Sequence, residues 1–383
     1  MIELREACLR SNARFRLVPF DRLSAHQLQA PGSLSDDPDF FGVLLPAEDS
    51  ALPIKSVSRE AALLFMALRE AARLPHLLKS LFGNDASERV RQLILDSVLE
   101  VELDGRFVSG PSALTLLGER TNAEPATRLA RLSRDAISYA AALEQVPVQE
   151  LAGRLYLFNA TPCTRSWHER LDDEGKFNAF LFEGNGVQER LASNWRRQTV
   201  GDSWLAWRSD EVAHRLPYKL YVSPSPEQLP AVFALVTRAL AKTRCRYFKL
   251  GRGTFGVLRP DKVVAYFGGL EELHQATELI QAAVTGVAAQ GVPFTAPIDT
   301  QGLLSWGMDP PRFEQVPAEQ QHQSWRQWLT SRIAVYVAAA RESGADVPSF
   351  VRNRIALDGV DPVSWNPDLA IWRGPVGTEQ ERF

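Results

Sequence analysis

The stretch RYFKLGRGTFGVLRPDKVVAYF, residues 246–267, decides the fold of the second half of the chain. Residues 246–250 combine aromatic and apolar side chains and predict a short strand, and residues 262–267 predict a second, apolar strand. The connection between them predicts a glycine hairpin, because it carries Gly251, Gly253 and Gly256. The stretch therefore predicts two neighbouring strands of one sheet.

Cationic side chains gather around this hairpin. Upstream, the segment PYKLYV (217–222) predicts a third strand, on which Lys219 and Tyr221 share one face because side chains alternate along a strand. Several cations focused on one sheet edge form a site for an anion, and phosphate is the usual candidate. The sequence predicts Lys249 at this site, with four phosphate-binding side chains: Lys219, Arg252, Arg259 and Lys262.

Lys249 has two interpretations. An exposed lysine on an edge strand can serve only to prevent aggregation. Alternatively, desolvation by its apolar neighbours Tyr247, Phe248 and Leu250 would lower its pKa toward that of a general base. The second interpretation predicts catalysis or anion binding at this position.

Composition excludes several classes of protein. The chain has 383 residues, of which 45% are hydrophobic and 23% charged, and this composition predicts an ordinary globular protein. Its net charge is −3, so it lacks the overall positive charge that would attract nucleic acid. It has no apolar run of the ~20 residues that span a bilayer, which predicts no membrane association. Its three cysteines are far apart (Cys8, Cys163, Cys245) and predict a cytoplasmic protein without structural zinc. The six histidines show no ligand spacing, so no metal and no cofactor is predicted.

The chain predicts an α+β protein of two domains. Residues 1–147 predict a mostly helical, winged-helix-like module: helices in 1–30, a loop in 31–56, a helix starting at Ser58, a helix at 86–98 and an Asp-Gly hairpin at 99–108. A helical lid with a hairpin is the open alternative. Residues 148–383 predict a mixed-sheet domain.

The second half predicts mixed strands and helices around that sheet. Residues 154–159 predict a strand and residues 291–311 a turn-rich segment. Helices are predicted at 226–243, 269–290 and 317–343, and another is predicted at 125–144, before the domain boundary. The tryptophans of residues 184–212 predict aromatic anchors of a partly buried loop, with a peptide groove as the alternative.

Two motifs near the hairpin are excluded by context. Gly251 to Gly256 matches the dinucleotide-binding pattern G-x-G-x-x-G, but it is predicted to lead into a strand and not a helix. A protein kinase would need a lysine in residues 263–267 and the later H-R-D and D-F-G motifs, which are missing.

Two further residues are weighed as members of a site. Cys163 is predicted to be a thiol without a catalytic role, because no partner base for it is identified in the sequence. His214 is predicted to lie on the surface, and the alternative is that it contributes to the anion site.

Three segments resemble bacterial phosphothreonine lyases, the related lyase domains of lanthipeptide synthetases and a plant-pathogen type III effector family. They are YKLYV (218–222), YFKL (247–250) and LRPDKVVAYF (258–267). Shorter blocks of the effector-like family follow at 293–297, 305–307, 359–362 and 365–367, so the resemblance covers roughly residues 150–368. Stand-alone members of this superfamily occur among the modifying proteins of ribosomally made peptides.

The resemblance implies a lyase-like fold and elimination of phosphate from phosphoserine or phosphothreonine. It implies Lys249 as the base, Arg259 as a phosphate ligand, and Lys219 as a group that binds phosphate or lowers the pKa of Lys249. Tyr221 stands where the family has its acid, a histidine. It follows that Tyr221 serves as the acid, that His214 replaces it, or that catalysis is lost.

Two functions of different classes follow from the resemblance. The first is a lyase that eliminates phosphate from a ribosomally made, lanthipeptide-type precursor peptide after a separate kinase has acted. The second is a non-catalytic pseudo-lyase that binds the precursor peptide or a partner modifying enzyme, such as a kinase or cyclase, through the hairpin at 99–108. A bacterial host-targeting effector is a third hypothesis.

Overall fold

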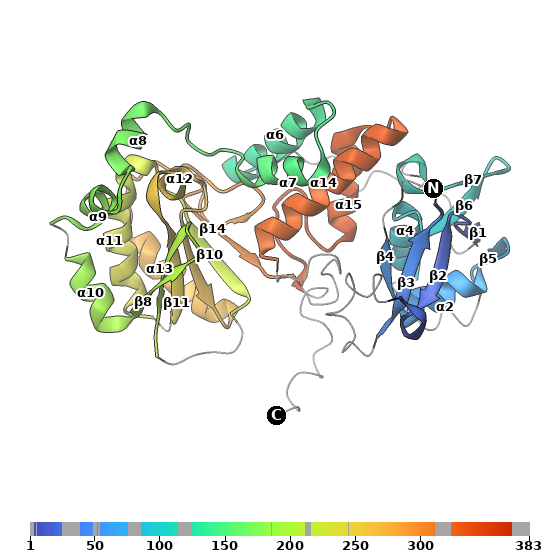
Figure 1. The fold of residues 1–383 in the computed structure, drawn as a ribbon, viewed down its shortest axis with the longest axis horizontal. Helices are drawn as coiled ribbons and strands as arrows, with labels where there is room; N and C mark the ends of the chain where they lie inside the picture. The colour runs from blue at the N-terminus through green and yellow to red at the C-terminus, as the bar shows by residue number, and fades with distance from the viewer. Residues whose placement is uncertain are drawn as a thin grey trace.

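The computed structural model arranges the chain as a sheet lobe, a helical layer and an N-terminal lobe, in that order from left to right in Figure 1. It describes residues 4, 6–24, 39–48, 52, 54–75, 86–113, 124–184, 186–210, 216–243, 245–310 and 323–369. Helices and antiparallel sheets occur together, which confirms the α+β class.

The sheet lobe contains a seven-stranded sheet in which every described pairing is antiparallel. Its strands, in spatial order, are β13 (Ala296–Pro297), β14 (Leu304–Met308), β10 (Tyr218–Val222), β12 (Val263–Phe267), β11 (Tyr247–Gly251), β9 (Trp204–Arg208) and β8 (Arg196–Val200). The three predicted strands are confirmed, but the predicted mixed sheet is wrong. The reason is that β12 inserts between β10 and β11, which a helix joins, and runs antiparallel to both.

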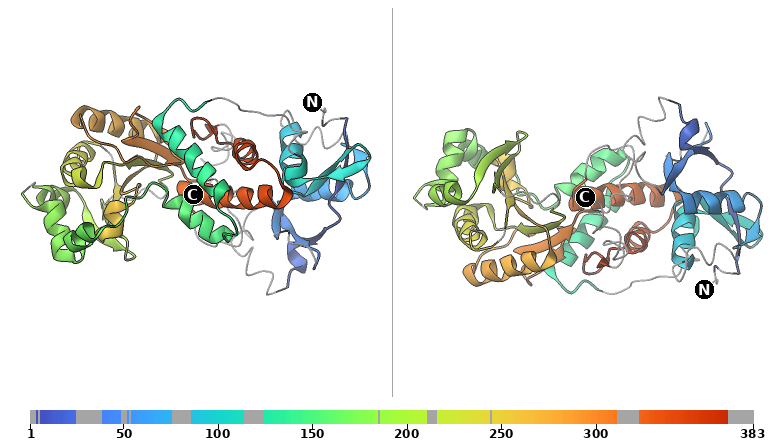
Figure 2. Two further views of the ribbon diagram at one scale, coloured as in Figure 1. Left: turned by 90° about the horizontal axis from the view of Figure 1, so that it is seen from above. Right: turned by 90° about the horizontal axis from the view of Figure 1, so that it is seen from below.

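One face of this sheet is covered by helices and forms the core of the lobe. The ring of Trp207 in β9 stacks on Phe248 in β11 at 5.2 Å, and both rings pack against Phe233 of α11. The helices of this lobe are α8 (Arg165–Leu171), α9 (Glu174–Phe182), α10 (Val187–Asn194), η4 (Pro226–Gln228), α11 (Leu229–Leu240) and α13 (Leu270–Ala283). Figure 2 shows α9, α10, α11 and α13 on the outer side of the sheet. Side chains that alternate to the opposite face point away from this core.

The glycine connection differs from its prediction. It forms a short helix, α12 (Gly253–Leu258), and not a hairpin turn. A Cβ on Gly251 would lie 2.2 Å from the carbonyl oxygen of Gly256, so these glycines allow the strand and the helix to touch. The dinucleotide motif therefore does open a helix, but this helix has six residues and leads to an antiparallel strand, which is not the parallel unit that a dinucleotide needs.

The helical layer packs against the edge of the sheet that β13 and β14 form. It consists of α6 (Arg128–Ala142), α7 (Val148–Tyr156), α14 (Trp325–Ser343) and α15 (Val347–Leu357), with α14 against α7, α15 and β14. The predicted strand at 154–159 is wrong, because Leu151 and Leu155 are one helical turn apart and bury the same face of α7. The segment 291–311, expected to be rich in turns, contains strand β14. The helix expected at 317–343 corresponds to α14, which begins at Trp325.

The N-terminal lobe contains two sheets, so the helices predicted within residues 1–30 are wrong, because Cys8–Ser11 and Phe15–Pro19 form strands. Two sheets, in the orders β5-β1-β6-β7 and β2-β3-β4, accompany two α-helices and two short 3-10 helices within the described residues. The elements are β1 (Cys8–Ser11), β2 (Phe15–Pro19), η1 (Phe20–Arg22), β3 (Phe40–Pro46), β4 (Lys55–Ser58), α2 (Arg59–Ala67), β5 (Ala72–Arg73), α4 (Ala86–Leu95), β6 (Leu99–Leu103), β7 (Arg106–Val108) and η3 (Gly110–Ala113).

Two local predictions in this lobe are confirmed. Ser58 caps α2 by accepting the backbone N–H of Ala61, and the hairpin of β6 and β7 turns at Asp104 and Gly105, which have φ of 44° and 75°. Neither the winged-helix arrangement nor the division at residue 148 is confirmed, and both stay predictions.

Candidate functional site

Two lysines lie on the face of the central sheet that the helices of the sheet lobe do not cover. Lys219 of β10 is opposite Tyr266 of β12, and Lys249 of β11 is opposite Val264 of the same strand. Since Val264 and Tyr266 are two residues apart, both lysines point to one side. Their ammonium nitrogens lie 5.4 Å and 5.6 Å from the centre of the Tyr266 ring.

Trp204 joins Lys249 to Arg259. This residue is opposite Gly251 at the start of β9, and its ring centre lies 4.1 Å from both Lys249 Nζ and Arg259 Cζ. The two cationic groups are therefore at most twice that distance apart. Among the described residues, Lys249 Nζ has no hydrogen-bond or ion-pair partner, and it lies over the rings of Trp204 and Tyr266.

A buried carboxylate holds Arg259 in place. Asp261 accepts hydrogen bonds from Arg259 at 2.6 Å and 3.3 Å and from the Tyr156 hydroxyl at 2.9 Å. Arg326, at the start of α14, forms an ion pair with the same carboxylate at 2.9 Å. Arg259 also donates to the Tyr156 hydroxyl at 3.0 Å. The two guanidinium groups lower the pKa of Asp261 far below its ordinary value despite its burial.

Lys219 has its own carboxylate partner. Its ammonium forms an ion pair with Asp309, which follows β14, and the same Asp309 oxygen accepts the backbone N–H of Trp325 at 3.2 Å. The side chain of Lys219 is 5% exposed, whereas that of Asp309 is 32% exposed, so the pair joins a buried ammonium to a partly exposed carboxylate. We call Lys219, Lys249, Arg259 and Arg326, together with their carboxylates Asp261 and Asp309, the cationic cluster.

The pKa of Lys249 is shifted to where the group can act as a base. The pKa of Lys249 falls from 10.5 to about 8, mainly because the side chain is buried. Within this shift, the positive charge of Lys219 lowers the pKa by more than the negative charge of Asp261 raises it. Burial also lowers the pKa of Lys219, against the opposing effect of Asp309. The cluster therefore places one lysine with an accessible neutral form beside three other cations.

The tyrosines around the cluster keep their protons. Burial raises the pKa of Tyr156 to about 12, and it raises the pKa values of Tyr221 and Tyr266 well above 10. Tyr221 is 3% exposed and lies on the same side of β10 as Lys219. These phenols can donate hydrogen bonds, but they are weaker acids than an ordinary tyrosine.

The structure brings four of the predicted site residues together: Lys219, Tyr221, Lys249 and Arg259. Lys262 does not join them, because its buried ammonium donates to the Pro224 carbonyl and to Gln290. Arg252 points to the helix-covered side, where it pairs with Glu174 of α9 at 3.1 Å. The prediction that these two bind phosphate has no support in their positions. His214 lies outside the described residues.

Sequence reasoning missed five residues of the site: Trp204, Tyr156, Asp261, Arg326 and Asp309. Only Asp261 had a local signal, since it lies between Arg259 and Lys262 in the predicted anion segment. The sequence predicts a partly buried loop around Trp204, whereas this residue begins strand β9. No local pattern relates Arg326 or Tyr156 to the sheet, because both come from helices distant in sequence.

The arrangement has the chemistry to bind a dianion and to accept a proton. Neighbouring arginine and lysine groups can hold the oxygens of a phosphate, and a neutral amine beside them can act as a general base. Within the described residues, no group of three or more His, Cys, Asp or Glu side chains is placed to hold a metal ion. None of the described helices has the length and apolar character of a membrane span.

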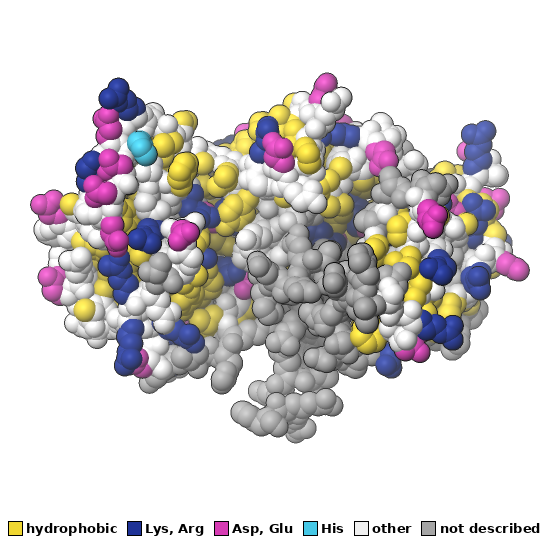
Figure 3. Space-filling view, in the orientation of Figure 1, with side chains coloured by type: hydrophobic (Ala, Val, Ile, Leu, Met, Phe, Trp, Pro, Cys, Tyr) yellow, Lys and Arg dark blue, Asp and Glu magenta, His cyan; other side chains and the backbone are white. Residues whose placement is uncertain are grey.

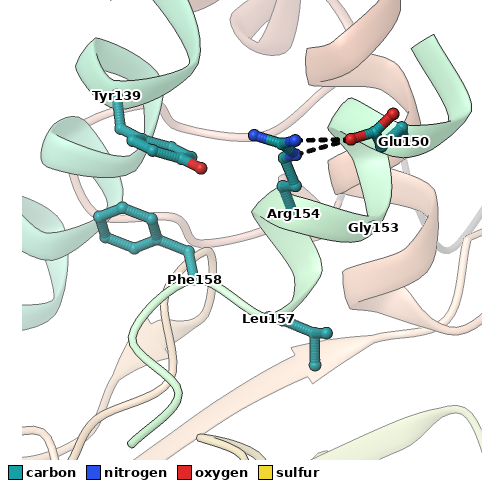
Figure 4. A pocket seen from close by; sticks show the side chains of 6 residues that line it. All are labelled: Tyr139, Glu150, Gly153, Arg154, Leu157 and Phe158. Atoms are coloured by element: carbon teal, nitrogen blue, oxygen red, sulfur yellow. Dashed lines mark hydrogen bonds and ion pairs between the residues drawn. The ribbon is translucent and has the colours of Figure 1, made fainter. Parts of the chain in front are cut away.

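A separate, shallow and open depression of about 540 Å³ lies beside α6 and α7 (Figure 4). It is lined by Tyr139, Glu150, Gly153, Arg154, Leu157 and Phe158, none of which belongs to the cationic cluster. In Figure 3, Lys and Arg side chains lie among hydrophobic ones on the part of the sheet lobe that faces the helical layer. The cationic cluster and this depression are therefore different features.

No protein-family model and no curated protein matches the chain. Solved structures that it resembles include an effector protein from Pseudomonas syringae pv. syringae strain 61, with 12% identity, a TM-score of 0.37 and coverage of 64% of this chain and 99% of the other. Others are the phosphothreonine lyase effector VirA (SpvC) from Chromobacterium violaceum (11%, 0.28, 52% and 98%) and the phosphothreonine lyase SpvC from Salmonella (11%, 0.27, 52% and 98%).

Proposed function

We propose that the chain is a lyase that eliminates phosphate from phosphoserine or phosphothreonine in a peptide and leaves a dehydroamino acid. The observation that carries the proposal is Lys249. Its amine has a pKa of about 8, lacks a polar partner among the described residues, and shares the Trp204 ring with Arg259. The segments that contain Lys219 and Lys249 resemble those of phosphothreonine lyases, and this resemblance is the reason for proposing the elimination of phosphate.

Lys249 acts as the general base. Its neutral amine takes the α-proton of the phosphorylated residue, and the electron pair of that C–H bond forms the Cα–Cβ double bond. The Cβ–O bond breaks, and its electrons leave with the phosphate. At pH 7 about one molecule in ten has a neutral Lys249, whereas an ordinary lysine is almost wholly protonated.

The rest of the cluster binds the phosphate. When Lys249 is neutral, three cations remain against the two carboxylates, so the cluster carries net positive charge and favours a dianion. Asp261 accepts two hydrogen bonds from Arg259 and forms an ion pair with Arg326, and charges held in place in this way stabilise a leaving group without rearrangement.

Lys219 is the general acid in this proposal. The departing phosphate is strongly basic until it receives a proton, and Lys219 is a stronger acid than an ordinary lysine because burial lowers its pKa. Tyr221 stands where the family has histidine, but its pKa is raised well above 10. It supplies a hydrogen bond to the phosphate, and the proton comes from Lys219.

The substrate in this proposal is a ribosomally made precursor peptide of the lanthipeptide type. A partner kinase phosphorylates it in the cytoplasm, and the N-terminal lobe binds the peptide or a partner enzyme such as a cyclase. A non-catalytic pseudo-lyase is the second candidate. Tyr221 favours this candidate, because it stands where the family has a histidine as its acid, and a tyrosine is a weaker acid than a histidine.

The test is a mass measurement. The purified protein is incubated with a phosphothreonine peptide, and the expected product has lost the phosphate and carries a dehydro residue. Lys249→Ala should lower the rate by about 100- to 10,000-fold, as removal of a general base does. Peptide binding without mass change by the wild type would leave the pseudo-lyase as the better description.

A further inference from the structure

Arg208 lies on the same face of the central sheet as Lys249, the face that the helices do not cover, which we call the open face. Lys249 of β11 is directly opposite Ala206 of β9, and Arg208 stands two residues further along β9, so both side chains point to the open face. With a rise of about 3.3–3.4 Å per residue and a strand spacing of about 4.8 Å, the Cα atoms of Lys249 and Arg208 are about 8 Å apart. Arg208 is therefore a neighbour of the cationic cluster without being part of it.

The charge of Arg208 is not matched by a carboxylate of the described chain. Asp210 follows β9, but its carboxylate pairs with Arg196 of the edge strand β8 at 2.7 Å. Among the described residues, Arg208 has no hydrogen-bond or ion-pair partner, although its side chain is half-buried. A partly desolvated arginine without a counter-charge gains from binding a carboxylate, which can accept two parallel hydrogen bonds from the guanidinium group.

Tyr247 places a second hydrogen-bond donor beside Arg208. The two residues are directly opposite each other on β11 and β9. Burial raises the pKa of Tyr247 and the charge of Arg208 opposes this, so the phenol keeps its proton and can donate it. The Tyr247 ring contacts that of Tyr266, with centroids 4.9 Å apart, and Lys219 and Lys249 lie over the Tyr266 ring. The two tyrosine rings therefore line the open face between Arg208 and the lysines.

The balance of charge on this part of the open face favours an acidic ligand. Arg196 is directly opposite Arg208, so two arginines stand there against one carboxylate, that of Asp210. One positive charge remains uncompensated among the described residues, in a chain whose net charge is −3. A carboxylate in the ligand is the complementary group.

We propose that Arg208, together with the hydroxyl of Tyr247, binds the carboxylate of an acidic residue of the substrate peptide, two or three residues from the phosphorylated one. The inference rests on the proposed function, which places the phosphorylated residue beside Lys249. An extended peptide advances about 3.3–3.6 Å per residue, so a separation of about 8 Å corresponds to two or three residues. Because Arg208 lies to one side of Lys249, the acidic residue is expected on one side of the phosphorylated residue and not on the other.

Binding of labelled peptides tests the inference independently of catalysis. Each peptide carries the phosphonate analogue of phosphothreonine, in which a methylene group replaces the bridging oxygen, so that phosphate cannot leave. One aspartate is placed at each position from four residues before to four after the analogue, in a background of glycine and serine, and fluorescence anisotropy gives the Kd. Aspartate two or three residues away on one side should tighten binding about three- to ten-fold over the peptide without aspartate.

Reversal of the charge at Arg208 separates recognition from a structural role. Arg208→Glu should lose the preference for aspartate and should instead favour lysine at the same position of the peptide, a gain that a misfolded variant would not show. Arg208→Gln is a milder change and should lose the aspartate preference even if the glutamate variant folds poorly. Arg238→Gln is the matched control, because it removes an exposed arginine from α11 on the helix-covered side of the sheet and should leave the preference intact.

The outcomes separate this inference from the lyase activity. A one-sided aspartate preference that Arg208→Glu converts to a lysine preference supports the inference, even if phosphothreonine peptides keep their phosphate and the lyase proposal fails. Equal binding of all peptides by the wild type overturns the inference, even if phosphothreonine peptides lose their phosphate. Equal gains from aspartate on both sides also overturn it, because the peptide would then be attracted to the cationic face as a whole and not to Arg208.

Discussion

Arg326 forms a 2.9 Å ion pair with Asp261, and this contact joins the helical layer to the central sheet. Arg326 is the second residue of α14, whereas Asp261 lies just before β12. Both side chains are buried, with exposed fractions of 1% and 4%. The proposed phosphate site is therefore completed by a helix outside the sheet, and its geometry depends on how that helix docks.

Asp261→Asn should destabilise the protein by about 3–5 kcal/mol, because it leaves Arg259 and Arg326 buried without their counter-charge. Urea denaturation measures the change. Asp172→Asn is the matched control: it removes an exposed pair with Lys176 on α8–α9 and should leave the midpoint unchanged. A midpoint for Asp261→Asn that equals the wild-type value would mean that the two arginines are held by other groups.

The rate of elimination should depend on pH through Lys249. Its pKa of about 8 predicts that log kcat/KM rises with unit slope below pH 8 and becomes level above it, and then falls where the proposed acid Lys219, whose pKa burial lowers, loses its proton. Measurements between pH 7 and 10 avoid the second ionisation of the phosphate, near pH 6. A rise that continues to pH 10 would indicate an ordinary lysine and would contradict the assignment of the base.

Part of the site could be predicted from the sequence because its signals are local. Two-residue alternation places Lys219 and Tyr221 on one face, and the short segments at 218–222 and 247–250 form the strands that carry both lysines. The partners that set the electrostatics come from far away in the chain. Tyr156 and Asp261 are 105 residues apart, and no periodicity encodes such a pair.

The N-terminal lobe could not be predicted for a similar reason. Strand β1 has only four residues, and its partners are Leu99–Leu103 and Ala72–Arg73. So short a strand has no clear alternation, and it is stabilised by pairing with segments more than 60 residues away. The Asp-Gly hairpin at 104–105 was predictable because the residues that turn and the residues that pair are neighbours.

The identity of the acid is tested by comparing two variants on β10. Lys219→Met should lower kcat/KM by about 100-fold or more, whereas Tyr221→Phe should lower it less than ten-fold, because the raised pKa of Tyr221 makes it a poor proton donor. Lys219→Met should also move the pH midpoint upward, since the charge of Lys219 lowers the pKa of Lys249. The opposite order of the two rate losses would assign the acid to Tyr221.

The predicted role of Lys262 as a phosphate ligand disagrees with its position in the structure. The sequence groups it with the phosphate ligands, but its ammonium is buried and donates to Pro224 and Gln290. Lys262→Met should therefore keep elimination within about two-fold of the wild type, whereas Lys249→Met should lose it. Equal loss of activity in both variants would place Lys262 in the site after all.

The same variant has a predictable effect on stability. Burial lowers the pKa of Lys262 to about 7 in the folded protein, while the unfolded chain keeps a value near 10.4. The unfolded state thus binds more protons between these values, and this lysine makes the wild type more stable as pH rises from 7 to about 10.4. Lys262→Met lacks that contribution. The unfolding free energy of the variant relative to wild type should be most favourable below pH 7 and should decline toward pH 10, and a difference independent of pH would show that Lys262 is not desolvated.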